Sequence, residues 1–249
     1  MQFTAAAMRS RIADRDTAAA FYSVDHLPDS DGKPMGETSR HVLLIVETLD
    51  ALRAYFRDDP HMFIIGNFFV YFLDAAGVLK RLAPDIFAVR GVGQEERRVY
   101  AVEREGKAPE FVIEFTSKKT KKSDFVNKKG LYAWLGVQEY FLFDPFGEYL
   151  KPRLMGFRLL GGKYNTITCQ GEELRLHSEY LNLDLVAEGG RLRFWNASAG
   201  DFLLTHQELE DQRRVEAEAY AREAQARRAA ESEVARLREE LSRFRQNKE

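Results

Sequence analysis

The sequence is poor in cysteine, because Cys169 is the only one in 249 residues. A single thiol excludes an internal disulfide framework and a cysteine-based zinc site, so we expect a cytoplasmic protein. Long uncharged apolar runs are also missing, which argues against a membrane-spanning helix. The first residues lack an apolar core of signal-peptide length. We therefore expect no membrane association.

The chain also lacks an excess of charge of one sign, since its formal net charge is -2. This balance gives no global attraction to nucleic acid, so any basic surface must be local. From residue 206 onward glycine and proline are missing, and Glu, Arg, Ala and Gln dominate. We therefore divide the chain into an N-terminal tail (1–26), a folded domain (27–205) and a C-terminal coiled-coil helix (206–249).

The C-terminal segment carries a short apolar seam. Val234, Leu237, Leu241 and Phe244 follow one another at the 3,4,3 spacing of a coiled coil, although Ala and Arg fill most seam positions before them. We expect a long exposed helix that pairs with another copy to form a homo-oligomer, or with a partner. The pattern sets neither the strand number nor the direction.

Residues 109–117 are the most informative stretch. Apolar residues alternate along it as in a buried strand, and Glu114 lies inside this run. A buried carboxylate needs a partner, and a metal cation or a lysine would serve. Asp85 is a second acid in a similar setting. Two carboxylates near apolar strands, with lysines downstream, favour a divalent-metal phosphodiesterase.

Asp85 and Glu114 can hold Mg²⁺ or Mn²⁺ if their strands are neighbours, and the backbone carbonyl of Phe115 can add a third oxygen. A lysine would stabilise the charge that develops on the phosphate in the transition state, and Lys128 is the candidate. Glu37 is a further candidate acid. Alternatively, Glu37 has no role in the metal site and is an acid at a helix start, where the helix dipole favours a negative charge.

A run of lysines follows the strand that bears Glu114. Lys118, Lys119, Lys121 and Lys122 can hold a phosphate backbone without base specificity, or they form an ordinary solvated segment. A third use of the acid pair is hydrolysis of a sugar. The lysine cluster, and the lack of an aromatic sugar platform near these acids, disfavour that alternative.

The local patterns predict several elements. Helical spacing of apolar residues, from Val42 through Val46 to Phe56, predicts a helix capped by Thr38 or Ser39. Residues 82–89 read as one strand, and 91–107 as a charged loop. Residues 110–144 read as a strand, helix, strand unit that builds a parallel pair. Glycine pairs at 161–162 and 189–190 predict hairpins in an antiparallel extension. We expect His41 on a helix surface, and Cys169 and Trp195 in the core.

The motifs also occur in a characteristic order. They are Pro84-Asp85, residues 109–117, Asp124, Lys128, Tyr132, Leu135-Gly136-Val137, Glu139-Tyr140 and Phe143-Asp144-Pro145. In this order and spacing the chain resembles the Uma-two restriction endonuclease family, a bacterial branch of the PD-(D/E)XK nuclease superfamily, over residues 28–185. Some members also carry a coiled-coil tail similar to residues 206–249.

The resemblance implies an α/β fold with a restriction-endonuclease-like mixed central sheet and flanking helices. It implies a metal-dependent endonuclease that hydrolyses DNA, with Mg²⁺ or Mn²⁺ at Asp85 and Glu114. Thr116 stands where the superfamily has its lysine, and in this family the lysine looks displaced onto the helix, here to Lys128. If Lys128 does not reach the metal site, the alternative is a catalytically inactive nucleic-acid-binding or assembly module of the same fold.

Overall fold

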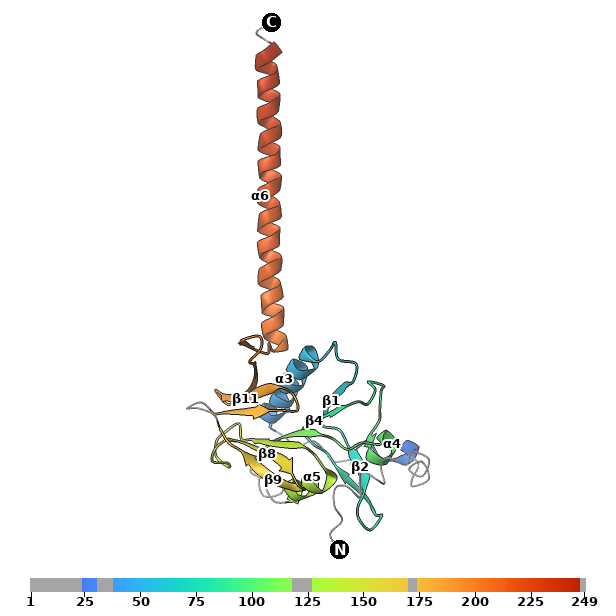
Figure 1. The fold of residues 1–249 in the computed structure, drawn as a ribbon. Helices are drawn as coiled ribbons and strands as arrows, with labels where there is room; N and C mark the ends of the chain where they lie inside the picture. The colour runs from blue at the N-terminus through green and yellow to red at the C-terminus, as the bar shows by residue number, and fades with distance from the viewer. Residues whose placement is uncertain (1–23, 31–37, 118–126, 170–173, 247–249) are drawn as a thin grey trace. The chain divides into compact units, whose positions relative to one another are not determined.

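The computed structural model describes residues 24–30, 38–117, 127–169 and 174–246. Contacts within the chain separate it into two units, Met1–Leu203 and Leu204–Glu249. The first unit contains three β-sheets and short helices, and the second is built on the long helix α6 (His206–Gln246) (Figure 1). None of the described helices combines the length and the apolarity that crossing a membrane requires.

A six-stranded mixed sheet lies at the centre of the first unit, in the order β1, β4, β6, β7, β8, β9. Strands β6 and β7 run parallel, and the other neighbours run antiparallel. Helix α5 joins β6 to β7, so the predicted strand, helix, strand unit is confirmed. The bounds are β1 (Met62–Gly66), β4 (Ile86–Arg90), β6 (Phe111–Phe115), α5 (Lys129–Leu135), β7 (Glu139–Phe143), β8 (Leu154–Leu160) and β9 (Lys163–Ile167).

Two smaller sheets and three helices complete the first unit. The predicted single strand over 82–89 is wrong, because β3 ends at Leu82 and β4 begins at Ile86 in a different sheet. The region 91–107, expected to be a loop, contains β5 and α4. The bounds are η1 (Val24–His26), α3 (Ser39–Tyr55), β2 (Val70–Leu73), β3 (Leu79–Leu82), β5 (Tyr100–Ala101), α4 (Val102–Glu105), β10 (Arg175–Ser178), β11 (Leu183–Glu188), β12 (Arg191–Asn196) and β13 (Asp201–Phe202).

Both predicted glycine hairpins are present, but they belong to different sheets. The β8–β9 hairpin extends the central sheet, whereas β11 and β12 pair within the four-stranded sheet β10–β13. Trp195 on β12 is half-buried and meets Phe202 edge-on. Cys169 follows β9 and is exposed, so its predicted core position is wrong.

Alternation along β6 sends its side chains into two cores. Phe111, Ile113 and Phe115 pack in a core shared with α3 and the four-stranded sheet. Val112 packs in a second core, which contains Tyr132 of α5 and residues of the three-stranded sheet. Since successive side chains of a strand point to opposite faces, Glu114 belongs to the second face, toward α5.

Helix α3 begins as predicted, with Thr38 as the N-cap that accepts a hydrogen bond from the backbone N–H of His41. Its buried face differs from the predicted one. Val42 and Val46 are exposed, whereas His41 is buried on the same face as Ile45. The surface position expected for His41 is therefore wrong.

Candidate functional site

The pairing of β4 with β6 brings the two predicted acids together. Ile86 lies opposite Ile113 in the antiparallel register, so one step further Asp85 comes opposite Glu114. Asp85 precedes β4, and its Oδ2 accepts a 2.7 Å hydrogen bond from the backbone N–H of Phe115. The Asp85 carboxylate is thereby tied to the residue that follows Glu114.

The Glu114 carboxylate is inside the protein, with a side chain that is 2% exposed. Nζ of Lys128 lies 2.8 Å from Oε2, and the hydroxyl of Tyr132 donates a 2.6 Å hydrogen bond to Oε1. Lys128 immediately precedes α5 and Tyr132 lies one turn later, so both side chains reach Glu114 from the same helix end. The buried negative charge is therefore compensated by an ammonium group and a hydroxyl.

The pKa of Tyr132 lies well above its ordinary value. Burial is the largest cause, and the negative charge of Glu114 adds to it. A phenol in this environment keeps its proton at neutral pH. Tyr132 is thus a permanent hydrogen-bond donor to Glu114.

His41 is a residue of this region that the sequence interpretation missed. Its Nε2 lies 3.4 Å from Oδ1 of Asp85, and its ring meets the ring of Phe115 edge-on with centroids 6.0 Å apart. The signal was present, because His41 shares a helical face with the buried Ile45 and Thr48. Asp85 therefore has His41 at one oxygen and the Phe115 amide at the other.

Thr116 is buried next to this cluster. Its backbone N–H donates to the carbonyl of Phe143, while its Oγ1 is buried with no hydrogen-bond partner among the described residues. A threonine cannot supply the positive charge of the lysine that the sequence resemblance leads us to expect at this position. In this protein the ammonium group at Glu114 comes from Lys128, 14 residues later in the chain.

The chemistry of the donors fits a hard divalent cation. Asp85, directly before β4, and Glu114 on the neighbouring strand β6 offer carboxylate oxygens, and the carbonyl of Phe115 follows Glu114 directly in sequence. Within the described ranges, no three His, Cys, Asp or Glu side chains converge as a metal site. The third predicted acid, Glu37, and the predicted phosphate-binding residues lie outside the described part of the chain. Those residues are Lys118, Lys119, Lys121 and Lys122.

Another buried acid, Glu139, has a different environment. Both Nε and an amino group of Arg158 donate to its Oε1, and the hydroxyl of Ser178 donates to its Oε2. Arg158 also donates to the carbonyl of His177 on β10. This cluster connects the central sheet to the four-stranded sheet, so Glu139 has a structural role.

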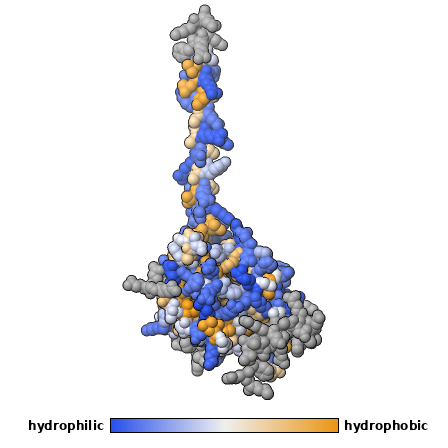
Figure 2. Space-filling view, viewed as in Figure 1, coloured by the Kyte–Doolittle hydropathy of each residue, from blue (hydrophilic) through white to orange (hydrophobic). Residues whose placement is uncertain are grey.

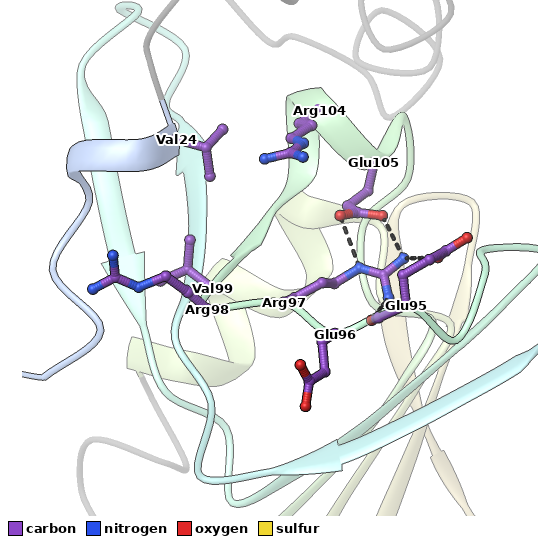
Figure 3. A pocket seen from close by; sticks show the side chains of 8 residues that line it. All are labelled: Val24, Glu95, Glu96, Arg97, Arg98, Val99, Arg104 and Glu105. Atoms are coloured by element: carbon purple, nitrogen blue, oxygen red, sulfur yellow. Dashed lines mark hydrogen bonds and ion pairs between the residues drawn. The ribbon is translucent and has the colours of Figure 1, made fainter.

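A pocket of about 370 Å³ lies beside α4 (Figure 3). Its lining contains three arginines and three glutamates, and Arg97 donates to both Glu105 and Glu95. The hydrogen bond that Arg97 donates to the Glu105 carboxylate is the largest cause of the raised pKa of Arg97. Because the carboxylates offset the guanidinium groups, this pocket has no excess positive charge for a phosphate.

Comparison with known proteins identifies one family. The family model described as "Uma2: Putative restriction endonuclease" matches residues 30–188. None of the curated proteins matches the chain. Among solved structures, the crystal structure of "a putative nuclease belonging to DUF820 from Anabaena variabilis ATCC 29413" is similar with 15% identity and a TM-score of 0.48. The alignment covers 68% of this chain and 97% of that one.

Proposed function

Since the chain belongs to the family described as "Uma2: Putative restriction endonuclease", we propose that it is a metal-dependent endonuclease that hydrolyses phosphodiester bonds of DNA. The observation that carries the proposal is the register that places Asp85 opposite Glu114, with the ammonium group of Lys128 within reach of the pair. Two carboxylates can hold a divalent cation for phosphodiester hydrolysis, and a lysine can stabilise the negative charge that develops on the phosphate.

Each residue of the cluster has a proposed role. Asp85, Glu114 and the carbonyl of Phe115 would bind Mg²⁺ or Mn²⁺ through oxygen. The bound cation would polarise the phosphodiester and lower the pKa of a water molecule. Lys128 would stabilise the negative charge that develops on the phosphate, and its 24% exposed side chain is accessible to a substrate. Glu37 would act as a third acid of the site.

The substrate would be held mainly through its backbone. We assign this contact to Lys118, Lys119, Lys121 and Lys122, which follow β6 in the sequence. Lysines neutralise phosphates without reading bases, so this contact gives affinity and leaves sequence specificity to other residues.

One observation favours a second function, a catalytically inactive nucleic-acid-binding or assembly module. Both oxygens of Glu114 already accept contacts, from Lys128 and from Tyr132. A divalent cation at Glu114 must share the carboxylate with the Lys128 ammonium or displace it. If Lys128 remains on Glu114, the carboxylate does not bind metal.

Cleavage of plasmid and linear DNA in Mg²⁺ or Mn²⁺ tests the proposal. We expect the wild type to cut, EDTA to stop it, and Glu114→Ala to be inactive, while Glu96→Ala, a change at an exposed acid, remains active. Loss of activity in both variants, or cleavage by Glu114→Ala, would contradict the site. Calorimetry with Mn²⁺ separates the two functions, because a module with Lys128 locked on Glu114 neither binds the ion nor cuts DNA.

A further inference from the structure

Helix α6 exposes several large apolar side chains to solvent. Its charged residues pair along the helix, as Arg222 does with Glu218 and Arg227 with Glu231. Each such pair stabilises a helix by only about 0.2–0.5 kcal/mol. Apolar patches are visible along the helix in Figure 2, and five large apolar side chains of α6 are 46 to 76% exposed: Val215, Tyr220, Val234, Leu237 and Leu241.

Most of these side chains lie on one stripe. Val215, Ala226 and Leu237 are successively 11 residues apart, and a repeat of 11 residues stays on one face of a nearly straight helix. Residues three or four positions from these three lie on the same face. The complete stripe is Val215, Ala219, Arg222, Ala226, Ala230, Glu233, Leu237 and Leu241.

The positions of the stripe are spaced almost symmetrically about its centre. Reversal about Arg228 brings Val215 opposite Leu241 and Ala219 opposite Leu237. It also brings Ala226 opposite Ala230, where small side chains let two helices approach closely. A second copy of the same helix, running in the opposite direction, therefore offers a complementary surface.

We propose that α6 pairs with α6 of a second copy of this chain in antiparallel orientation, with the two-fold axis near Arg228. The direction follows from the two charges in the stripe. In the antiparallel pair Arg222 lies next to Glu233 of the partner helix, twice by symmetry. In a parallel pair in register, Arg222 would face Arg222 and Glu233 would face Glu233, and like charges across a helix interface are unfavourable.

The charge along α6 supports the same direction. Residues 206–225 contain six acidic residues and three arginines, whereas residues 226–246 contain six arginines and four acidic residues. Antiparallel pairing places the acidic half of one helix beside the basic half of the other. The two halves then attract each other at moderate salt. This pairing goes beyond the proposed nuclease function and does not depend on it.

Sedimentation equilibrium of the full chain tests the association. We expect a dimer for the wild type at micromolar concentrations and a monomer for Leu237→Glu. Ser232→Glu is the matched control, because it adds the same charge on the face opposite to the stripe, and it should remain dimeric. Circular dichroism checks that each variant retains its helix. A monomeric wild type, or a Leu237→Glu variant as dimeric as the control, overturns the proposal.

A reciprocal charge exchange tests the direction. Arg222→Glu and Glu233→Arg should each weaken the dimer, because like charges then meet across the antiparallel pair. The double variant should restore the dimer to near the wild-type dissociation constant. In a parallel pair the double variant would still oppose like charges, so failure of the double variant to recover overturns the antiparallel assignment.

Disulfide cross-linking measures the direction independently. In a Cys169→Ser background, Val215→Cys mixed with Leu241→Cys should give a cross-linked heterodimer under mild oxidation. Each variant alone should not cross-link, because the two copies of residue 215 are about 40 Å apart at 1.5 Å of rise per residue. Cross-linking of Val215→Cys with itself would mean a parallel pair and overturn the proposal.

Discussion

The hydroxyl of Tyr132 donates a 2.6 Å hydrogen bond to Oε1 of Glu114, and Lys128, one helical turn earlier, contacts the other carboxylate oxygen. Tyr132 is fully buried, whereas Lys128 is partly exposed. The two donors therefore differ in what they can do. Tyr132 holds the carboxylate in place, whereas the Lys128 side chain is partly accessible from solvent, where the proposed phosphate substrate would contact it.

Removal of the Tyr132 hydroxyl should destabilise the protein. Tyr132→Phe keeps the ring in the core but leaves a buried carboxylate oxygen without this donor, so we expect the free energy of unfolding to fall by about 1–3 kcal/mol. Urea denaturation followed by circular dichroism measures it. Leu131→Met, a volume-conserving change at the neighbouring residue of α5, is the control. A Tyr132→Phe variant as stable as the wild type would show that the hydrogen bond contributes nothing.

Lys128 and Lys129 are adjacent in sequence but have different environments. Lys128 contacts Glu114, whereas Nζ of Lys129 lies 3.5 Å from the centroid of the Phe157 ring. We expect Lys128→Met to slow DNA cleavage by about a hundredfold, the scale of one lost transition-state contact, and to retain Mn²⁺ binding.

Lys129→Met is the matched control for that measurement and should cut DNA at close to the wild-type rate. Single-turnover cleavage rates and calorimetry with Mn²⁺ give the two readouts. Full activity of Lys128→Met would contradict the assignment of Lys128 as the lysine that takes the place of the one missing at Thr116.

The part of the site that lies on β6 was predictable, because the evidence for it is local. Alternation of Phe111, Ile113 and Phe115 identifies the strand, and Glu114 stands out as its one acid. The spacing of four residues between Lys128 and Tyr132 predicts that they share a helical face. The parallel pairing of β6 with β7 follows from the helix between them.

The rest of the site depends on contacts between distant segments. Residues 82–89 resemble one strand locally, but the chain changes sheets before Ile86 because β4 pairs with both β1 and β6. His41 approaches Asp85 only because α3 packs on the central sheet. Alternation of hydrophobicity does not encode which helix covers which face, so these contacts could not be read from sequence.

Asp85 has two separable functions that substitution can distinguish. Its Oδ2 accepts the backbone N–H of Phe115 inside the protein, and its charge is the proposed metal contact. Asp85→Asn keeps an acceptor for this N–H, so we expect near wild-type stability with loss of Mn²⁺ binding. Asp85→Ala should lose metal binding and about 1–3 kcal/mol of stability, because the buried N–H is left without its acceptor. If Asp85→Asn and Asp85→Ala are equally stable, the hydrogen bond from the Phe115 N–H does not stabilise the protein.

The lysine run should determine the salt dependence of DNA binding. Each phosphate contact that is lost reduces the slope of log K against log salt by about 0.9 for duplex DNA. Replacement of Lys118, Lys119, Lys121 and Lys122 by Gln should therefore lower both affinity and slope for every DNA sequence tested. Lys80→Gln together with Lys163→Gln, two exposed lysines elsewhere, is the control. An unchanged slope in the fourfold variant would exclude the run from the DNA contact.

Tyr100 should make the protein less stable in alkali. It is fully buried, its hydroxyl donates to the carbonyl of Lys107, and burial, with Glu105, raises its pKa far above the ordinary value of 10. Below pH 10 the phenol is protonated in both the folded and the unfolded chain, so its contribution is constant. Above pH 10 the unfolded chain releases the proton and the folded one retains it, which favours unfolding.

The free energy of unfolding should therefore fall above pH 10 with a contribution from Tyr100 that approaches about 1.4 kcal/mol per pH unit. Tyr100→Phe removes the titrating group, so its stability should fall less steeply between pH 10 and 11, even though it starts lower because Lys107 loses its donor. Urea unfolding at pH 8, 9, 10 and 11 for both proteins gives the two slopes. Parallel slopes would mean that Tyr100 ionises equally in the folded and unfolded chain, contrary to its burial.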